Sequence, residues 1–100
     1  MNRFFDELGE RWVAASERRS AKIEAPTLDA KVALELLELA RVAAHTQERR
    51  FAPLSCYMAG VAAERLRAAK GSLDDAEVAA LIVEVRQELE RETPAATNER

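Results

Sequence analysis

The chain has 100 residues, enough for one domain that folds around its own core. Its apolar fraction of 48% excludes a disordered chain, and its net charge of −3 excludes a broad nucleic-acid-binding surface. A single cysteine excludes an intrachain disulfide and suits a reducing compartment. No stretch resembles a signal peptide or reaches the ~20 apolar residues that span a bilayer. We therefore expect a soluble cytoplasmic protein with neither nucleic acid nor membrane as a partner.

Apolar residues recur at three- and four-residue steps and predict helices only. The first predicted helix covers about residues 3–20 and gathers the aromatic side chains Phe4, Phe5 and Trp12. Gly9 lies inside this helix and weakens it by about 1 kcal/mol relative to Ala.

A second helix is predicted over about residues 29–46, after Pro26, which disfavours helix at the residue before it. Charged side chains at positions 35, 38 and 41 mark its solvent-facing side. Its buried stripe is predicted to consist of Val32, Leu36, Leu39 and Ala43, widened by Leu37, Ala40 and Ala44.

The third predicted helix starts at Pro53, which suits a first helical turn, and ends at the C-cap Gly71. No charged residue occurs from Pro53 to Ala63, with large side chains on one face and small ones on another. A helix that is apolar nearly all round is a buried one, so we expect this helix at the centre of the fold. In that position Gly60→Leu would overpack the small face.

The fourth predicted helix, about residues 74–92, follows Ser72, which resembles the start of a capping box closed by Asp75. Pro94 ends this helix, and residues 94–100 read as a frayed tail. The fold class is therefore all-α: a compact bundle of four helices, leaning antiparallel, with a buried central third helix in one domain over residues 1–93. The apolar face of the fourth helix comprises Val78, Leu81, Ile82, Val85 and Leu89.

Charge is unevenly distributed along the chain. Residues 41–70 hold six Lys or Arg against two Glu, whereas residues 71–100 hold eight acids against three Arg. One interpretation is that the acidic fourth helix lies near the basic middle and offsets it, because charge runs are usually solvated faces. The other is a basic rim for an acidic or phosphorylated partner.

The lone His45 and the lone Cys56 are the candidates for catalysis. His45 falls near the end of the second helix, where an imidazolium gains from the helix dipole, and we favour that structural role. Cys56 lies near a helix start, where thiol pKa values fall, but its apolar neighbours favour a packing role. One His and one Cys cannot complete a zinc site, and no glycine-rich phosphate loop occurs. We expect no enzyme, no cofactor and no metal.

The turn "ERRFAP" between the second and third helices is the candidate binding site. Arg49 and Arg50 can grip a carboxylate or phosphate, with His45 and Arg41 on the preceding helix, and the next helix N-terminus would add donors. The alternative is that Phe51 packs the turn onto the core while the arginines stay solvated. A DNA-binding helix-turn-helix is excluded because the first turns of the third helix are too apolar to face base edges.

We also expect self-association, most simply as a two-fold dimer. A helix that is apolar on two faces needs cover on both, and the aromatic group of the first helix is large for so small a domain. The candidate interfaces are the aromatic face Phe4, Phe5 and Trp12, or the fourth-helix face Leu81, Val85 and Leu89.

The stretch "LLELARVAAHTQERRFAPLSCYMAGVAAERL" resembles a small actinobacterial domain of unknown function, whose pattern is like "LLxLARxxAHxxERxxAPLxxFLxGxAAG". Tyr57 stands where Phe is expected and Glu64 where Gly is expected, and residues 71–100 lie outside the pattern, as a local addition would. The matching positions are Leu39, Ala40, Arg41, Ala44, His45, Ala52, Pro53, Leu54, Gly60, Ala62 and Ala63.

Members of that family occur alone, or beside or joined to molybdenum cofactor guanylyltransferase. The resemblance implies a cytoplasmic helical accessory domain tied to molybdenum cofactor assembly or to a molybdoenzyme, and it carries no catalytic residues. We therefore predict a non-enzymatic protein-interaction module whose partner is that guanylyltransferase or a molybdoenzyme. The alternative is a small-ligand or anion-binding domain that uses the turn from His45 to Arg50.

Overall fold

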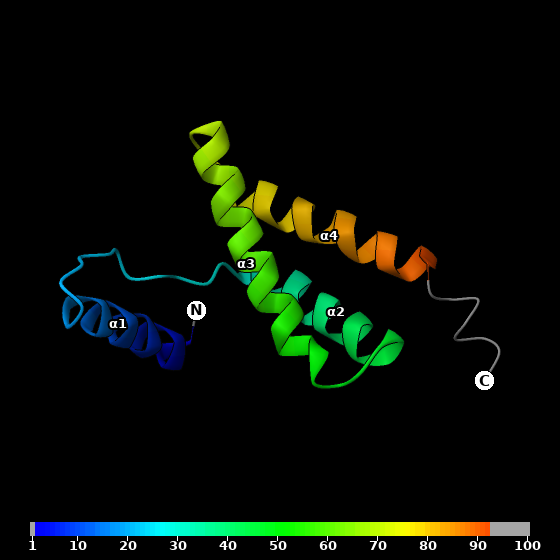
Figure 1. Ribbon diagram of the computed structural model, residues 1–100, viewed down its shortest axis with the longest axis horizontal. Helices are drawn as coiled ribbons and strands as arrows, with labels where there is room; N and C mark the ends of the chain where they lie inside the picture. Colours follow the sequence, from blue (N-terminus) through cyan, green and yellow to red (C-terminus); the bar gives the residue numbers. More distant parts are fainter. Residues whose placement is uncertain (1, 93–100) are drawn as a thin grey trace. The chain divides into compact units, whose positions relative to one another are not determined.

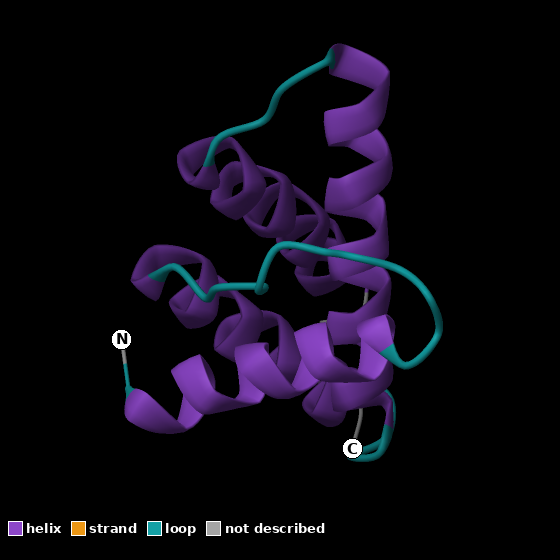
Figure 2. Ribbon diagram, turned by 90° about the vertical axis from the view of Figure 1, so that its left-hand side faces the viewer, coloured by secondary structure: helices purple, strands orange, loops and turns teal. Residues whose placement is uncertain are grey.

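The computed structural model describes residues 2–92 and contains helices and connecting loops, with no strand in that range (Figures 1 and 2). The prediction of an all-α protein with four helices is confirmed. The predicted tail at residues 94–100 lies outside the described residues. The helices are α1 (Arg3–Glu17), α2 (Ala30–Thr46), α3 (Phe51–Lys70) and α4 (Asp75–Glu92).

The chain divides into two compact units, Met1–Ala30 and Lys31–Arg100. The first contains α1 and the segment that follows it. The second contains α2 after its first residue, together with α3 and α4. The assignment of residues 1–93 to one domain stays a prediction.

In the first unit, α1 is capped at both ends. The Asn2 side chain accepts a hydrogen bond of 2.7 Å from the Phe4 N–H, and the Arg19 side chain donates to the Ala15 carbonyl at 2.9 Å. The helix ends at Glu17, three residues before the predicted end. The chain turns there because Ser20 adopts a left-handed conformation with φ of 64°, which a continuing helix does not allow.

Gly9 of α1 lies against the segment that follows the helix. It is the buried residue of α1, and a Cβ built on it would lie 2.7 Å from the Pro26 carbonyl oxygen. The extended residues 21–29 therefore approach the α1 backbone at a point where a side chain has no room. The cost of a glycine inside the helix is offset by this close approach.

The second unit is built around the pairing of α2 with α4. The predicted stripe of α2 is confirmed for Val32, Leu39 and Ala43, which are buried, whereas Leu37 is 67% exposed. The two helices meet through their side chains, and Ala79 of α4 is the most buried of them. The core cluster consists of Val32 and Leu39 from α2 and Ala79 and Ile82 from α4, with Leu36, Ala59, Val78 and Leu89 packed against it.

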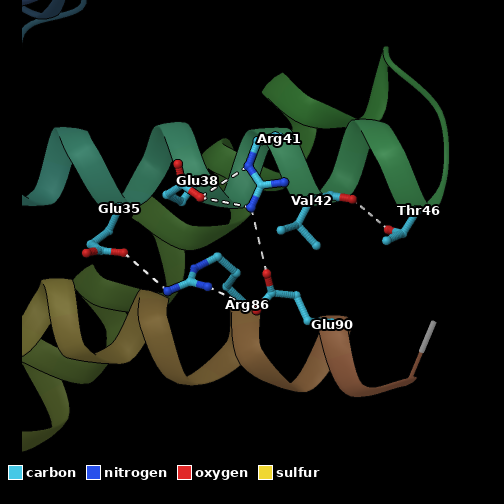
Figure 3. A network of polar contacts seen from close by, with 7 residues as sticks. All are labelled: Glu35, Glu38, Arg41, Val42, Thr46, Arg86 and Glu90. Carbon is cyan, nitrogen blue, oxygen red and sulfur yellow. Dashed lines mark hydrogen bonds and ion pairs between the residues drawn. The ribbon is translucent and has the colours of Figure 1, made fainter. Parts of the chain in front are cut away.

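A line of ionic contacts follows the same seam (Figure 3). Arg86 of α4 reaches Glu35 of α2 at 3.6 Å, and Arg41 of α2 reaches Glu90 of α4 at 3.8 Å. From the first contact to the second, the residue number increases on both helices, so α2 and α4 run parallel. The predicted antiparallel lean is therefore wrong for this pair. The predicted solvent-facing position of Glu35 is also wrong: its side chain and that of Arg86 are each only 16% exposed.

The acidic fourth helix does neutralise part of the basic middle. Arg41 pairs with Glu90, and Lys70 at the end of α3 pairs with Glu77 of α4 at 3.1 Å. These contacts support the first of the two interpretations of the uneven charge, in which α4 lies beside the basic segment and offsets it.

The third helix differs most from the prediction. It starts at Phe51, two residues before Pro53, and it contains no buried residue. Three of its large apolar side chains are exposed: Leu54 by 60%, Tyr57 by 74% and Met58 by 70%. The helix crosses the α2–α4 pair on one side only (Figure 1), so the predicted burial on two faces is not found among the described residues of the second unit.

The capping residues of the last two helices are partly as predicted. Gly71 ends α3 with φ of 93° and donates its N–H to the Arg67 carbonyl at 2.8 Å, as expected of a C-cap glycine. The capping box is not formed by Ser72. Asp74 accepts from the Glu77 N–H at 2.8 Å, and the Asp74 N–H donates to the Glu77 carboxylate at 2.9 Å. The Asp74 N–H and Lys70 lower the pKa of Glu77.

We predict opposite outcomes for the same substitution at two glycines. Gly9→Ala drives a Cβ against the Pro26 carbonyl and lowers stability by roughly 1–3 kcal/mol. Gly60→Ala meets nothing within 4 Å and raises stability by roughly 0.5–1 kcal/mol, so the expected overpacking at Gly60 is wrong. Urea denaturation measures both, with fluorescence of Trp12, the only tryptophan, reporting on α1. Equal shifts in the same direction would contradict the close approach at Gly9.

A second prediction concerns the half-buried ion pair. Arg86→Met leaves the Glu35 carboxylate under α4 without its cation and lowers stability by roughly 1–3 kcal/mol. The matched control is Arg67→Met, which breaks the exposed pair with Glu64 and is expected to change stability much less, because solvent screens that pair. Adding Glu35→Gln to Arg86→Met recovers part of the loss, because no unpaired charge then remains. Equal losses for both single variants would contradict the account.

Candidate functional site

An apolar groove opens between α3 and α4 in the second unit. Its walls come from α3 and α4, and Leu39 of α2 contributes to its lining. The volume is about 380 Å³, and Ser55 is the one residue of the lining with a polar side chain. The α3–α4 groove is lined by Leu39, Ser55, Met58, Ala59, Ala62, Leu81, Ile82, Val85 and Leu89.

A second apolar surface lies on α3 itself. Leu54, Tyr57 and Val61 follow one another at steps of three and four residues and so share a face of the helix, turned away from α4. A shallow hollow along α3 is lined in part by Tyr57 and Val61. We call Leu54, Tyr57 and Val61 the α3 outer face. Met58 separates this face from the α3–α4 groove.

The predicted dimer residues fall into two groups. Leu81, Val85 and Leu89 are brought together as the α4 wall of the groove. The aromatic residues lie on α1 in the first unit, where Phe4 is 60% and Trp12 is 54% exposed. The Phe4 and Phe5 rings meet edge to face with centroids 5.0 Å apart.

The candidate anion-binding residues lie near the turn between α2 and α3, and two of them already have carboxylate partners. Arg41 donates to Glu38 at 3.0 Å, and Arg50 donates to Glu48 at 2.7 Å. His45 and Arg49 are exposed. Among the four candidates, the His45 imidazole and the Arg49 guanidinium are therefore the ones without such a carboxylate partner in the described residues.

The N-terminus of α3 adds no free donors to that turn. The Phe51 N–H donates to the Glu48 carbonyl at 3.0 Å, and the Ala52 N–H donates to the Arg49 carbonyl at 3.1 Å. The next residue, Pro53, has no N–H. The expectation that this helix start contributes backbone donors to an anion is therefore wrong.

Cys56 faces α2 and not a cleft. Its thiol donates to the Leu36 carbonyl at 3.6 Å, and burial raises its pKa, which disfavours the nucleophilic thiolate. His45 lies nine residues further along α2, about 13 Å at the helical rise of 1.5 Å per residue. A hydrogen-bonded Cys–His pair does not form across that separation.

No group of three or more His, Cys, Asp or Glu side chains in residues 2–92 is placed to hold a metal ion. Within the same range, no helix has the length and apolar character to cross a membrane.

Sequence reasoning missed the groove and the α3 outer face as surfaces. It assigned the large residues of α3 to the core, because a charge-free run is typical of a buried helix. The missed groove residues on α3 are Ser55, Met58, Ala59 and Ala62. The signal that could have found them is the same run, read as an exposed apolar patch that a partner covers.

Comparison with known proteins gives one finding. A family model described as a domain of unknown function, DUF6457, matches residues 6–97. The match includes all of α4, so the expectation that the acidic fourth helix is a local addition is wrong. No curated protein and no solved structure matches the chain. Since the family model covers both helical units, the chain belongs to the DUF6457 family.

Proposed function

We propose that the chain is a non-enzymatic accessory module that binds a protein partner through the α3 outer face. The observation that carries the proposal is α3 itself: a helix of 20 residues with no buried side chain. Leu54 is 60% and Tyr57 is 74% exposed. Exposed apolar patches of this kind mark interaction sites, and tyrosine is a frequent source of binding energy there.

A bound partner would cover α3 on its second side. The helix would then be buried on two faces, with α2 and α4 on one and the partner on the other. The charge-free run from Pro53 to Ala63 fits such a helix, because it offers no charge that the complex would have to desolvate.

The partner in this proposal is molybdenum cofactor guanylyltransferase or a molybdoenzyme. Its support is the resemblance of residues 36–66 to a family pattern, which implies an association with that guanylyltransferase. A cytoplasmic location belongs to the same proposal, since a free cysteine such as Cys56 stays reduced there. The protonated, half-buried thiol and its separation from His45 support a role without catalysis.

Isothermal titration tests the proposal with the purified guanylyltransferase of the same organism, and with a purified molybdoenzyme as a second arm. Tyr57→Asp is expected to weaken binding at least about tenfold, because a charge replaces an apolar anchor. The matched control is Leu37→Asp on α2, which makes the same kind of change at a residue that is 67% exposed. Absence of binding in both arms, or equal affinity for Tyr57→Asp and the wild type, would refute the proposal.

A second candidate function is anion binding at the turn between α2 and α3. Its support is that His45, near the end of α2, and Arg49, shortly before α3, are both exposed near the short connection between these helices. Titration with inorganic phosphate and with GTP is expected to give heat that disappears in Arg49→Ala. Arg67→Ala, at an arginine already paired with Glu64, is the control and should bind as the wild type does. A folded protein that gives no heat with either ligand rules this function out.

A further inference from the structure

We propose that the α3–α4 groove is closed by the same groove of a second copy of this chain, related by a two-fold axis. The proposal goes beyond the accessory function, because it uses a different surface and does not depend on the partner bound at the α3 outer face. It commits to one of the two dimer surfaces expected from the sequence, the one on α4.

The lining of the groove requires an apolar occupant. Ser55 is the only lining residue with a polar side chain. The other lining residues, among them Leu39, Ile82 and Leu89, are apolar. Val85 on one wall is 45% exposed and Met58 on the other is 70% exposed. A small ligand of the usual kind needs several convergent polar groups to fix its orientation, and this lining does not supply them.

The charges beside the two walls have opposite signs. Arg65 follows Ala62 by three residues and Met58 by seven, so it lies on the α3 side of the groove. Glu84 and Glu88 follow Leu81 by three and seven residues, so they lie on the α4 side. All three side chains are exposed. No hydrogen bond or ion pair joins them to another residue in the described part of the chain.

This arrangement is complementary to itself. Arg65 lies on the α3 edge of the groove, and Glu84 and Glu88 lie on its α4 edge. A two-fold axis that runs along the groove, in the plane of its mouth, places the α3 edge of each copy against the α4 edge of the other. It would therefore bring Arg65 of each copy against the acidic α4 edge of the other, which includes Glu88, while the two Met58 side chains enter the facing apolar grooves.

Charge complementarity of this kind selects a second copy over an unrelated apolar segment. A generic apolar helix could fill the groove without any charges at its edges. A copy of the chain meets basic with acidic twice, once on each side of the contact, because an isologous interface repeats every pair.

Sedimentation equilibrium of the full chain, from low to high micromolar concentration, tests the dimer. The expected mass is twice the 11.1 kDa of one chain. Val85→Glu places a charge in the apolar mouth and is expected to give the monomer mass. Leu37→Glu makes the same kind of change on the exposed side of α2 and should remain dimeric. Circular dichroism of each variant checks that the helices are retained.

A charge exchange makes the test specific. Arg65→Glu and Glu88→Arg are each expected to raise the dimer dissociation constant about tenfold, and the double variant to restore it. A wild-type protein that stays monomeric would overturn the proposal, as would a dimer that none of the groove variants weakens, which would point to the aromatic face of α1. The two proposals are tested separately: Tyr57→Asp is expected to weaken guanylyltransferase binding, whereas Val85→Glu is expected to abolish the dimer and leave that binding unchanged.

Discussion

The packing of apolar side chains between α2 and α4 is the constraint on which the second unit depends. Ala79 is only 1% exposed and Ile82 3%, and both belong to one cluster with Leu39 of the opposing helix. The contact of Arg86 with Glu35 continues along the same seam. The ionic contact has a cost of desolvation, and the apolar contacts beside it hold the two charges together.

Because α2 and α4 supply the buried cluster between them, α3 contributes few side chains to the core. Ala59 is the α3 side chain that packs against the central cluster, and the Cys56 thiol reaches the backbone of α2. Small side chains at these points let α3 lie close to its neighbours while its large side chains project outward. The apolar surface of α3 is thus a direct result of where the core lies, and it is the reason why both proposed interaction surfaces include residues of this helix.

Much of the secondary structure follows from periodicity. The steps of three and four residues along Val32, Leu36 and Leu39 predict α2 and its buried stripe, and the C-cap Gly71 was identified from sequence alone. The burial of α3 was predicted wrongly, because apolar character shows what a helix can bury and not whether a neighbour is present. Glu35 was misplaced for a related reason: a carboxylate enters a seam when a cation such as Arg86 waits on the other helix, and that pairing joins distant parts of the sequence.

The contact between Gly9 and the Pro26 carbonyl sets a rule for relatives of this chain. The segment that follows α1 passes a place where the helix offers its bare backbone, so any side chain there requires the Pro26 carbonyl or the helix to shift, at a cost in stability. A relative that carries a side chain at this position must route the segment elsewhere, and its first helix and second unit are then joined by a connection of a different course. One position in an aligned sequence therefore reports how the two halves of a family member are linked.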